Sequence, residues 1–309
     1  MTHTFGAWAQ SGTWPTRPVR LMVGSAPGGG TDAMARAVAD KLGSALGQSV
    51  VVDNRPGASN TLAVDLVAKS TDRHAMVMGV STAHAIAPHL LKLNYDNDRD
   101  LVPVVFVGAV PNVLVVSPAL GVNTVSELVA RLKSQPGKMN YASSGSGSTQ
   151  HIAAEMFLEA TGTTATHVPY RGSAPALVDL MAGQVQFSFD TMASVAPHVK
   201  GGKVKALAVA ASERNAQLPE VPTLSQAGVN GVEMSAWYGI YMPASTPAPV
   251  QARVHDEVNK LLQQPDTRAR LAAIGSDVVP MTQAQFAAFH AEENRRYAEL
   301  IKRRNIKVD

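Results

Sequence analysis

The sequence predicts an α/β protein of two lobes, with a mixed sheet flanked by helices in each lobe. Its 309 residues exceed the usual length of a single domain. Short apolar runs alternate with segments of helical periodicity along most of the chain. Loops of small residues occur twice between an apolar run and a helical segment, once near the start of the chain and once in its middle.

The first of these loops, Gly24 to Gly30, follows the apolar run Val19 to Val23. Its consecutive glycines give the main chain conformations closed to other residues and allow a ligand to approach closely. Thr31 or Asp32 is expected to cap the helix that follows, which ends near Gly47. Unpaired N–H groups at such a helix start favour a carboxylate or a phosphate.

Three interpretations of this loop compete. Gly28, Gly30 and Ala33 fit the dinucleotide fingerprint G-x-G-x-x-G/A. Asp53 ends the next apolar run, so an NAD-dependent oxidoreductase is the alternative hypothesis. Asp32 argues against it, because its carboxylate would lie where a pyrophosphate binds. The phosphate loop G-x-x-x-x-G-K-[ST] is excluded, since Gly30 occupies the lysine position. The third interpretation is a tight turn without a ligand.

Composition excludes several classes of function. Charged residues make up 17% of the chain and the net charge of +3 is dispersed, which argues against nucleic acid as a partner. The absence of cysteine excludes disulfides, thiolate zinc sites and thiol nucleophiles. The nine histidines show no metal-binding spacing, and no G-x-S-x-G elbow occurs. We therefore expect no catalytic residue, no metal and no cofactor.

The N-terminus and the apolar runs bear on location. No apolar run approaches the ~20 residues of a membrane-spanning helix, so direct membrane insertion is not expected. Residues 1–13 lack a basic start and a hydrophobic segment, so the sequence as written carries no export signal. The stretch 7–9, Ala-Trp-Ala, resembles the end of a cleaved signal. Residues 1–13 are interpreted as a leader remnant or a tag without fixed structure.

The chain is expected to pass from the first lobe to the second near Pro111. The strand-like runs between Leu101 and Val116 break there. Ser235 to Met242 is the expected strand that returns the chain to the first lobe, with Trp237 and Tyr238 as core residues or as a wall of the cleft. The predicted lobe 1 comprises residues 14–110 and 233–309, and lobe 2 comprises 111–232. Further helices are expected over residues 124–133, 150–160, 219–228, 250–263, 266–274 and 282–304. The first of them begins with a capping-box pattern, Thr124 followed by Glu127.

The second small-residue loop, Ser143 to Thr149, lies inside lobe 2. It follows a short predicted strand, Met139 to Ala142, and precedes a predicted helix, Gln150 to Ala160. One loop of this kind is a turn. Two of them in different lobes indicate a shared cleft that presents backbone donors to one ligand.

Polar residues at the ends of other predicted strands are further candidates. Ser81, Thr82 and His84 follow one buried run. Arg171 lies beside a loop tip, where its planar guanidinium could bind a carboxylate or form a salt bridge. Asp190 ends another strand and could accept from a ligand amine or brace the cleft, and bracing is the favoured interpretation.

Several motifs then occur in a fixed order after Trp14. They are APGGGTD at 26–32, VVDNRPGAS at 51–59, NYASSGSGSTQH at 140–151, HVPYRGSAPAL at 167–177, VPTLSQAG at 221–228 and SAWYGIYMPASTP at 235–247. Together they resemble the Bug-type, TctC-like solute receptors of tripartite tricarboxylate transporters, over nearly the whole chain. The resemblance implies a type II, Venus-flytrap periplasmic binding protein without enzymatic activity, its export signal removed or replaced. It is expected to be a monomer that delivers a small carboxylate to membrane permease subunits.

The resemblance also implies which residues meet the ligand. The two small-residue loops would clamp a carboxylate through N–H groups, hydroxyls and ordered water, and residues of both lobes would meet the far end of the ligand. Family members take dicarboxylates, acidic amino acids or aromatic carboxylates, so the implied ligand is a small organic acid, aliphatic or aromatic. The expected ligand-binding residues are Ala26, Gly28, Gly29, Gly30, Thr31, Asp32, Ser81, Thr82, His84, Ser143, Gly145, Gly147, Ser148, Thr149, His151, Tyr170, Arg171 and Asp190.

Overall fold

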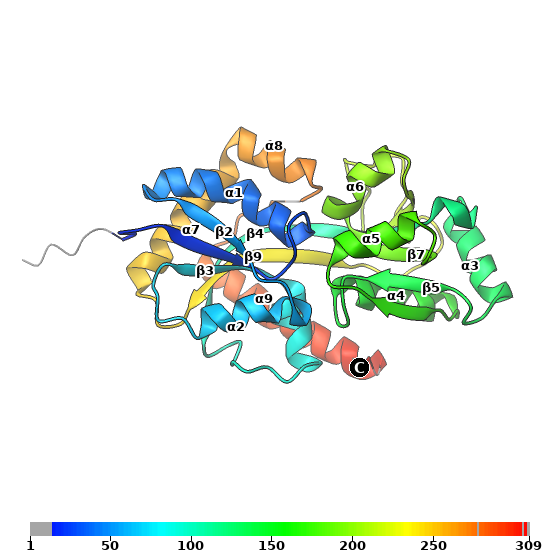
Figure 1. Cartoon of the computed structure of the whole chain (residues 1–309), viewed down its shortest axis with the longest axis horizontal. Helices are drawn as coiled ribbons and strands as arrows, with labels where there is room; N and C mark the ends of the chain where they lie inside the picture. Colours follow the sequence, from blue (N-terminus) through cyan, green and yellow to red (C-terminus); the bar gives the residue numbers. More distant parts are fainter. Residues whose placement is uncertain (1–13, 277, 305, 308–309) are drawn as a thin grey trace, which may run out of the picture.

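A computed structural model of the chain describes residues 14–276, 278–304 and 306–307. The predicted leader remnant or tag, residues 1–13, lies outside them. Figure 1 shows two groups of helices and strands joined by the long strands β4 and β9. Within the described ranges, no helix has both the length and the apolar character needed to cross a membrane.

The strands form a mixed sheet, as predicted, in the order β2-β1-β3-β9-β4-β7-β5-β6, with β8 paired to β4. β1 is parallel to β2 and β3, and β5 is parallel to β6 and β7. β9 runs antiparallel to β3 and β4 and so joins the two parallel groups. The strands are β1 (Val19–Val23), β2 (Val50–Asn54), β3 (Ala75–Val80), β4 (Leu101–Val116), β5 (Asn140–Ser143), β6 (Thr166–Pro169), β7 (Phe187–Thr191), β8 (Lys205–Val209) and β9 (Ser235–Pro243).

One continuous strand, β4, replaces the two runs predicted between Leu101 and Val116. Its first part pairs with β9 as far as Pro111, which lies opposite Ser235, the first residue of β9. Beyond Pro111, β4 pairs with β7 from Asn112 onward and with β8 from Val113 onward. The proline therefore falls where one ladder ends and the strand changes partner, which is a position that tolerates a missing N–H.

The helices agree with most of the predicted segments. The capping box of α3 is confirmed, because Glu127 N donates to Thr124 Oγ1 at 3.2 Å. In the turn before α9, Gln285 N donates to Thr282 Oγ1 at 3.2 Å. The helices are α1 (Gly30–Leu46), α2 (Thr61–Ala68), α3 (Val125–Ser134), α4 (Thr149–Thr161), α5 (Ser173–Met181), α6 (Met192–Lys200), α7 (Ala248–Gln263), α8 (Pro265–Ala273) and α9 (Gln283–Arg304).

The short helix predicted over residues 219–228 is wrong, because the structure has turns there. The main chain of this segment forms some hydrogen bonds within itself, but it also bonds to the end of β8. Val209 N donates to Pro222 O at 2.8 Å, and Leu224 N donates to Val209 O at 3.0 Å. Pairing with a strand thus overrides the local helical signal.

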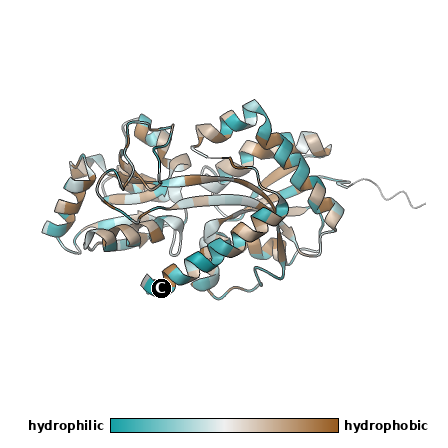
Figure 2. Ribbon diagram, turned by 180° about the vertical axis from the view of Figure 1, so that it is seen from behind, coloured by the Kyte–Doolittle hydropathy of each residue, from teal (hydrophilic) through white to brown (hydrophobic). Residues whose placement is uncertain are grey.

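Helix α9 packs its aromatic residues against the crossing strands. Phe286 and Phe289 meet Trp237 of β9 edge-on, with ring centroids 6.2 and 5.6 Å apart. Figure 2 shows α9 with hydrophilic residues along the face it turns away from these strands. Phe286 lies directly over Gly239, where a Cβ would come within 2.2 Å of the ring. The glycine therefore allows the long helix to seat on the strand that joins both halves.

We predict that Gly239→Ala lowers the free energy of unfolding by about 1–3 kcal/mol, because the added methyl group overpacks the contact with Phe286. Urea denaturation followed by circular dichroism measures the change. Phe286→Leu introduced into the Gly239→Ala protein should recover part of the loss, since it removes ring atoms from the clash. Equal unfolding midpoints for the native protein and Gly239→Ala would contradict this account of the contact.

Candidate ligand-binding site

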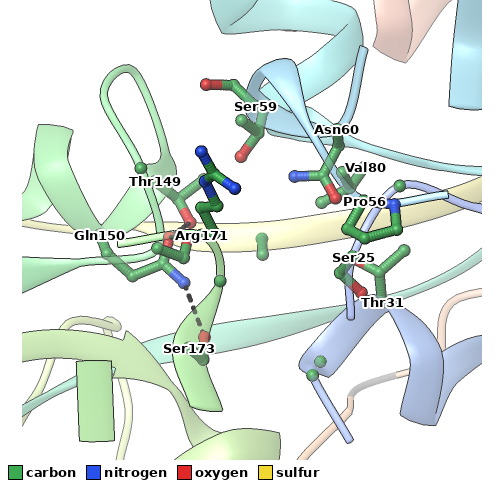
Figure 3. A pocket seen from close by; sticks show the side chains of 18 of the residues that line it. Ser25, Thr31, Pro56, Ser59, Asn60, Val80, Thr149, Gln150, Arg171 and Ser173 are labelled. Atoms are coloured by element: carbon green, nitrogen blue, oxygen red, sulfur yellow. Dashed lines mark hydrogen bonds between the residues drawn. The ribbon is translucent and has the colours of Figure 1, made fainter. Parts of the chain in front are cut away.

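A pocket of about 130 Å³ lies between the two groups of strands. Figure 3 shows it with Ser25, Thr31 and Asn60 on one side and Thr149, Gln150 and Arg171 on the other. Its volume is below the ~300–1,000 Å³ of pockets that hold drug-sized ligands, so it suits a small molecule. The lining residues are Gly24, Ser25, Gly29, Gly30, Thr31, Pro56, Gly57, Ala58, Ser59, Asn60, Val80, Thr82, Ser144, Gly145, Thr149, Gln150, Tyr170, Arg171, Gly172, Ser173, Thr191, Ala236 and Tyr238.

Within the described residues, five helices begin at this pocket. The first residues of α1, α4 and α5, which are Gly30, Thr149 and Ser173, line it. The N-cap residues of α2 and α6, Asn60 and Thr191, line it as well. Helix N-termini carry partial positive charge and unpaired N–H groups, so their convergence favours a bound anion.

The helix starts at the pocket have N–H groups available for a ligand. The N–H groups of Gly30, Thr31, Thr149, Gln150 and Ser173 donate no hydrogen bond within the described part of the chain. The glycine-rich loops, in contrast, use several of their donors internally. Gly28 N donates to Asp32 Oδ2, Gly29 N to Ala26 O, Gly145 N to Ser143 Oγ and Gly147 N to His151 Nδ1. Some donors of each loop therefore hold the loop in shape, while the helix starts keep their donors available for a ligand.

Asp32 braces the first loop and does not cap α1, whose N-cap is Gly29. Besides Gly28, its carboxylate accepts hydrogen bonds from Arg36 Nε and Asn54 Nδ2, both at 3.0 Å. Burial alone would raise the pKa of Asp32, but these hydrogen bonds lower it on balance. The prediction that Thr31 or Asp32 caps α1 is therefore wrong. Asp32 is the third residue of the helix, and from there its carboxylate reaches back to Gly28 N.

The structure separates the predicted site residues into two sets. Those that line the pocket are Gly29, Gly30, Thr31, Thr82, Gly145, Thr149, Tyr170 and Arg171. Those outside the lining are Ala26, Gly28, Asp32, Ser81, His84, Ser143, Gly147, Ser148, His151 and Asp190. Members of the second set support the first, as the following contacts show.

His84 is a buried core residue. Its ring stacks on Tyr241 with centroids 3.8 Å apart, and its Nδ1 lies 2.8 Å from Asn97 Oδ1. Burial, with His290 nearby, lowers the pKa of His84 to about 3, so the ring is neutral. Asn294 Nδ2 donates to His84 O at 3.1 Å. His84 thus anchors the turn that presents Thr82 to the pocket.

In the second loop, Ser148 and His151 act as scaffold residues. Ser148 Oγ caps α4 by accepting from His151 N at 3.2 Å. The ring of His151 stacks on His167 at 4.0 Å, and burial lowers the pKa of His151 to about 4. Ser143 Oγ lies 2.7 Å from His167 Nε2 and donates to Gly145 O. These contacts fix the loop shape behind the pocket.

Asp190 lies directly behind the lining, with 1% of its surface exposed. Its Oδ1 accepts from Ser173 Oγ at 2.8 Å, Gln150 Nε2 at 3.2 Å and Thr191 N at 2.7 Å. All three donors belong to lining residues. Burial raises the pKa of Asp190 to about 6, although these hydrogen bonds act in the opposite direction. The contacts are those of the bracing role that the sequence favours.

Arg171 is the one charged side chain in the lining among the described residues. It is exposed and has no ion-pair partner in the described part of the chain. Its neighbour Tyr170 donates through Oη to Asp179 Oδ2 at 2.6 Å, which fixes the phenol ring. In the described ranges no group of histidine and acidic side chains could hold a metal ion.

Sequence reasoning missed the segment from Pro56 to Asn60 and several helix-start residues. Ala58, Ser59 and Asn60 have positive φ angles of 45°, 54° and 72°, and Ser59 Oγ donates across the pocket to Ser146 O at 2.7 Å. Only the turn-forming sequence hinted at this segment. Gln150, Ser173 and Thr191 could have been found as second, first and N-cap residues of helices that follow strands.

A two-lobe α/β fold with an anion-favouring pocket between its halves defines the class of two-lobe solute-binding proteins. The family model "Tripartite tricarboxylate transporter family receptor" matches residues 34–306. The chain belongs to this family.

Individual relatives agree with this assignment. BugT from Bordetella pertussis is 35% identical, over 99% of this chain and 95% of BugT. The solved structure of R. palustris Rpa4515 with adipate is 33% identical to this chain. The match has a TM-score of 0.92 and covers 95% of this chain and 99% of the Rpa4515 chain. MatC from Rhodopseudomonas palustris with bound malate is also 33% identical, with a TM-score of 0.87 over 93% of this chain and 100% of MatC.

Family membership confirms the Bug-type resemblance and the two-lobe binding-protein fold. The family is a class of periplasmic receptors and not of enzymes. The comparisons do not support the dinucleotide alternative. In the structure, Asp53 pairs with Arg55 at 2.9 Å, and Asp32 already occupies the Gly28 N–H.

We predict that lowering the pH raises the free energy of unfolding of the native protein relative to that of the Asp190→Asn variant. The folded protein holds a proton on Asp190 below about pH 6, whereas the unfolded chain takes it up only near the ordinary value of 3.8. Between these values the folded state binds more protons, so stability rises as pH falls. The free energy of unfolding of the native protein, minus that of the variant, should increase by up to about 3 kcal/mol from pH ~7 to ~4.

Urea denaturation of both proteins across this pH range measures the difference. Titrations common to both proteins, such as those of His84 and His151, cancel in the subtraction. A difference that stays constant with pH would show that Asp190 is ionised throughout.

Proposed function

We propose that this protein is an extracytoplasmic receptor that captures a small organic acid in the pocket and delivers it to the permease of a tripartite tricarboxylate transporter. The observation that carries the proposal is the convergence of helix N-termini on one pocket between the lobes. Neutral donors of this kind hold an anion without requiring a cationic side chain for each charge.

The lining residues favour an acid of one or two carboxylates, aliphatic or aromatic. A first carboxylate fits the helix starts around Gly30 and Thr149, and a second fits the guanidinium of Arg171, which suits a planar carboxylate. Among the described residues no Asp or Glu lines the pocket to repel an anion. The relatives solved with adipate and malate support a small dicarboxylate as the ligand.

The proposed mechanism is closure of lobe 1, residues 14–110 and 233–309, on lobe 2, residues 111–232. β4 and β9 pass between these segments beside the pocket, which suits a hinge. Contacts from both sides, including Ser59 with Ser146, favour the closed form that a permease would recognise. Family membership supports a periplasmic location after export, and we propose a monomeric receptor.

A thermal-shift screen of the refolded, ligand-stripped protein tests the function. The panel contains aliphatic monocarboxylates, dicarboxylates, tricarboxylates, acidic amino acids, aromatic carboxylates and NAD. A ligand that binds only the folded protein raises its stability by RT ln(1 + [L]/Kd), so an acid class that raises the melting temperature is the ligand class. No shift with any acid would refute the proposal, and a shift with NAD alone would favour an oxidoreductase.

We predict that Arg171→Gln weakens binding of a dicarboxylate by about ten- to a hundredfold, since the second carboxylate loses a charge-assisted hydrogen-bond partner. Isothermal titration calorimetry measures the change. The matched control is Arg131→Gln, which removes the same charge from α3, outside the pocket lining, and should leave the affinity unchanged. An equal loss in both variants would indicate a general effect of net charge.

A further inference from the structure

We propose that Ser144, Thr149 and Ser173 form a wall that accepts a hydrogen bond from the ligand, so that the preferred ligand is a hydroxylated carboxylic acid. This inference rests on the proposed function and narrows its ligand. All three hydroxyl groups belong to residues that line the pocket on the side of lobe 2.

Asp190 sets the direction of the hydrogen bonds behind this wall. An ionised carboxylate only accepts hydrogen bonds, so the Gln150 atom 3.2 Å from Asp190 Oδ1 must be the amide nitrogen. The amide of Gln150 is thereby oriented, and its Oε1 faces the opposite way as an acceptor. Figure 3 shows the Gln150 nitrogen turned toward Ser173, to whose Oγ it donates at 3.5 Å.

The hydroxyl protons of the wall are then directed away from the ligand. Ser144 Oγ and Thr149 Oγ1 donate to Gln150 Oε1 at 2.9 and 3.3 Å. Ser173 Oγ donates to Asp190 Oδ1 at 2.8 Å. A hydroxyl group has one proton and two acceptor lone pairs, so each of these groups has only acceptor capacity left for a ligand.

A bare carboxylate or methylene group does not complement such a wall. Carboxylate oxygens are acceptors and belong at the helix starts and at Arg171, where the donors lie. A methylene group would cover the hydroxyl oxygens without hydrogen-bonding them, and burying unpaired polar groups is unfavourable. A hydroxyl on the carbon chain supplies the missing donor.

An ammonium group also donates, but the pocket lacks a contact partner for its charge. No acidic side chain lines the pocket in the described part of the chain. Asp190 lies behind the lining, and its Oδ1 is occupied by donors from the protein. Desolvating an ammonium without an anionic contact is costly. The wall therefore selects a hydroxy acid over both the unsubstituted acid and the amino acid.

Calorimetry with matched ligand pairs tests this inference on the whole protein at about pH 8, where Asp190 is ionised. The pairs are succinate with malate and glutarate with 2-hydroxyglutarate, each as separate enantiomers, with aspartate as the amino analogue. The better hydroxy enantiomer should bind about tenfold more tightly than its parent acid, and aspartate should bind no more tightly than succinate. Equal affinities within both pairs, or tighter binding of aspartate, would overturn the inference. Absence of binding by every acid would instead refute the proposed function.

Variants of the wall assign the selectivity to named atoms. Ser144→Ala and the isosteric Thr149→Val each remove one acceptor. The double variant leaves only the Ser173 acceptor and should lower the hydroxy-to-parent affinity ratio from about ten to about three. The affinity for the parent acid should change little. Ser134→Ala is the matched control, because Ser134 ends α3, outside the pocket lining. An unchanged ratio in the double variant would overturn the role of the wall.

Discussion

The pocket depends on the parallel pairing within each half of the sheet. In the described structure, β1, β2 and β3 run in one direction together, and β5, β6 and β7 form the corresponding group. The carboxyl ends of parallel strands lie at the same edge, so the loops that follow them, and the helices after those loops, begin near one another. The antiparallel strands β4 and β9 connect the two parallel groups, so that the loop-bearing ends of both groups face one cleft. An anion-binding pocket is thus built by topology before any particular side chain is considered.

Two buried carboxylates support this pocket from opposite sides. The desolvation of each carboxylate is compensated by a different kind of hydrogen-bond donor. Asp32 receives the guanidinium of Arg36, and its pKa is lowered on balance. Asp190 receives only neutral donors, and burial raises its pKa to about 6. An ion pair keeps a carboxylate ionised over a wide pH range, whereas neutral donors leave it close to protonation. The first arrangement makes the loop before α1 rigid, and the second orients the polar groups of Gln150 and Ser173.

Sequence reasoning predicted features that depend on neighbours along the chain. The alternation of strands and helices, the capping of α3 by Thr124 and the two small-residue loops all follow from local patterns. It failed where contacts between distant segments decide the structure. β4 continues through Pro111 because β7 and β8 pair with it beyond the end of the β9 ladder. His84, polar and next to a predicted loop, is buried because Tyr241 and Asn97 enclose it. Neither partner can be identified from spacing.

The turn at Ala58, Ser59 and Asn60 bears on the proposed closure of the lobes. Left-handed backbone costs roughly 1–2 kcal/mol for each residue with a Cβ, and local contacts hold this turn in place. Thr61 Oγ1 donates to Ala58 O at 2.6 Å, and a Cβ on Gly24 would lie 2.5 Å from Asn60 O. The turn presents the Ser59 hydroxyl to Ser146, yet one neutral hydrogen bond contributes only about 1 kcal/mol. Asn215 and Gln217 add two more hydrogen bonds between the proposed lobes, to Gly275 O and Ala272 O. Because a few bonds of this size stabilise a closed form only weakly, the proposed closure favours a ligand that contacts both sides of the pocket.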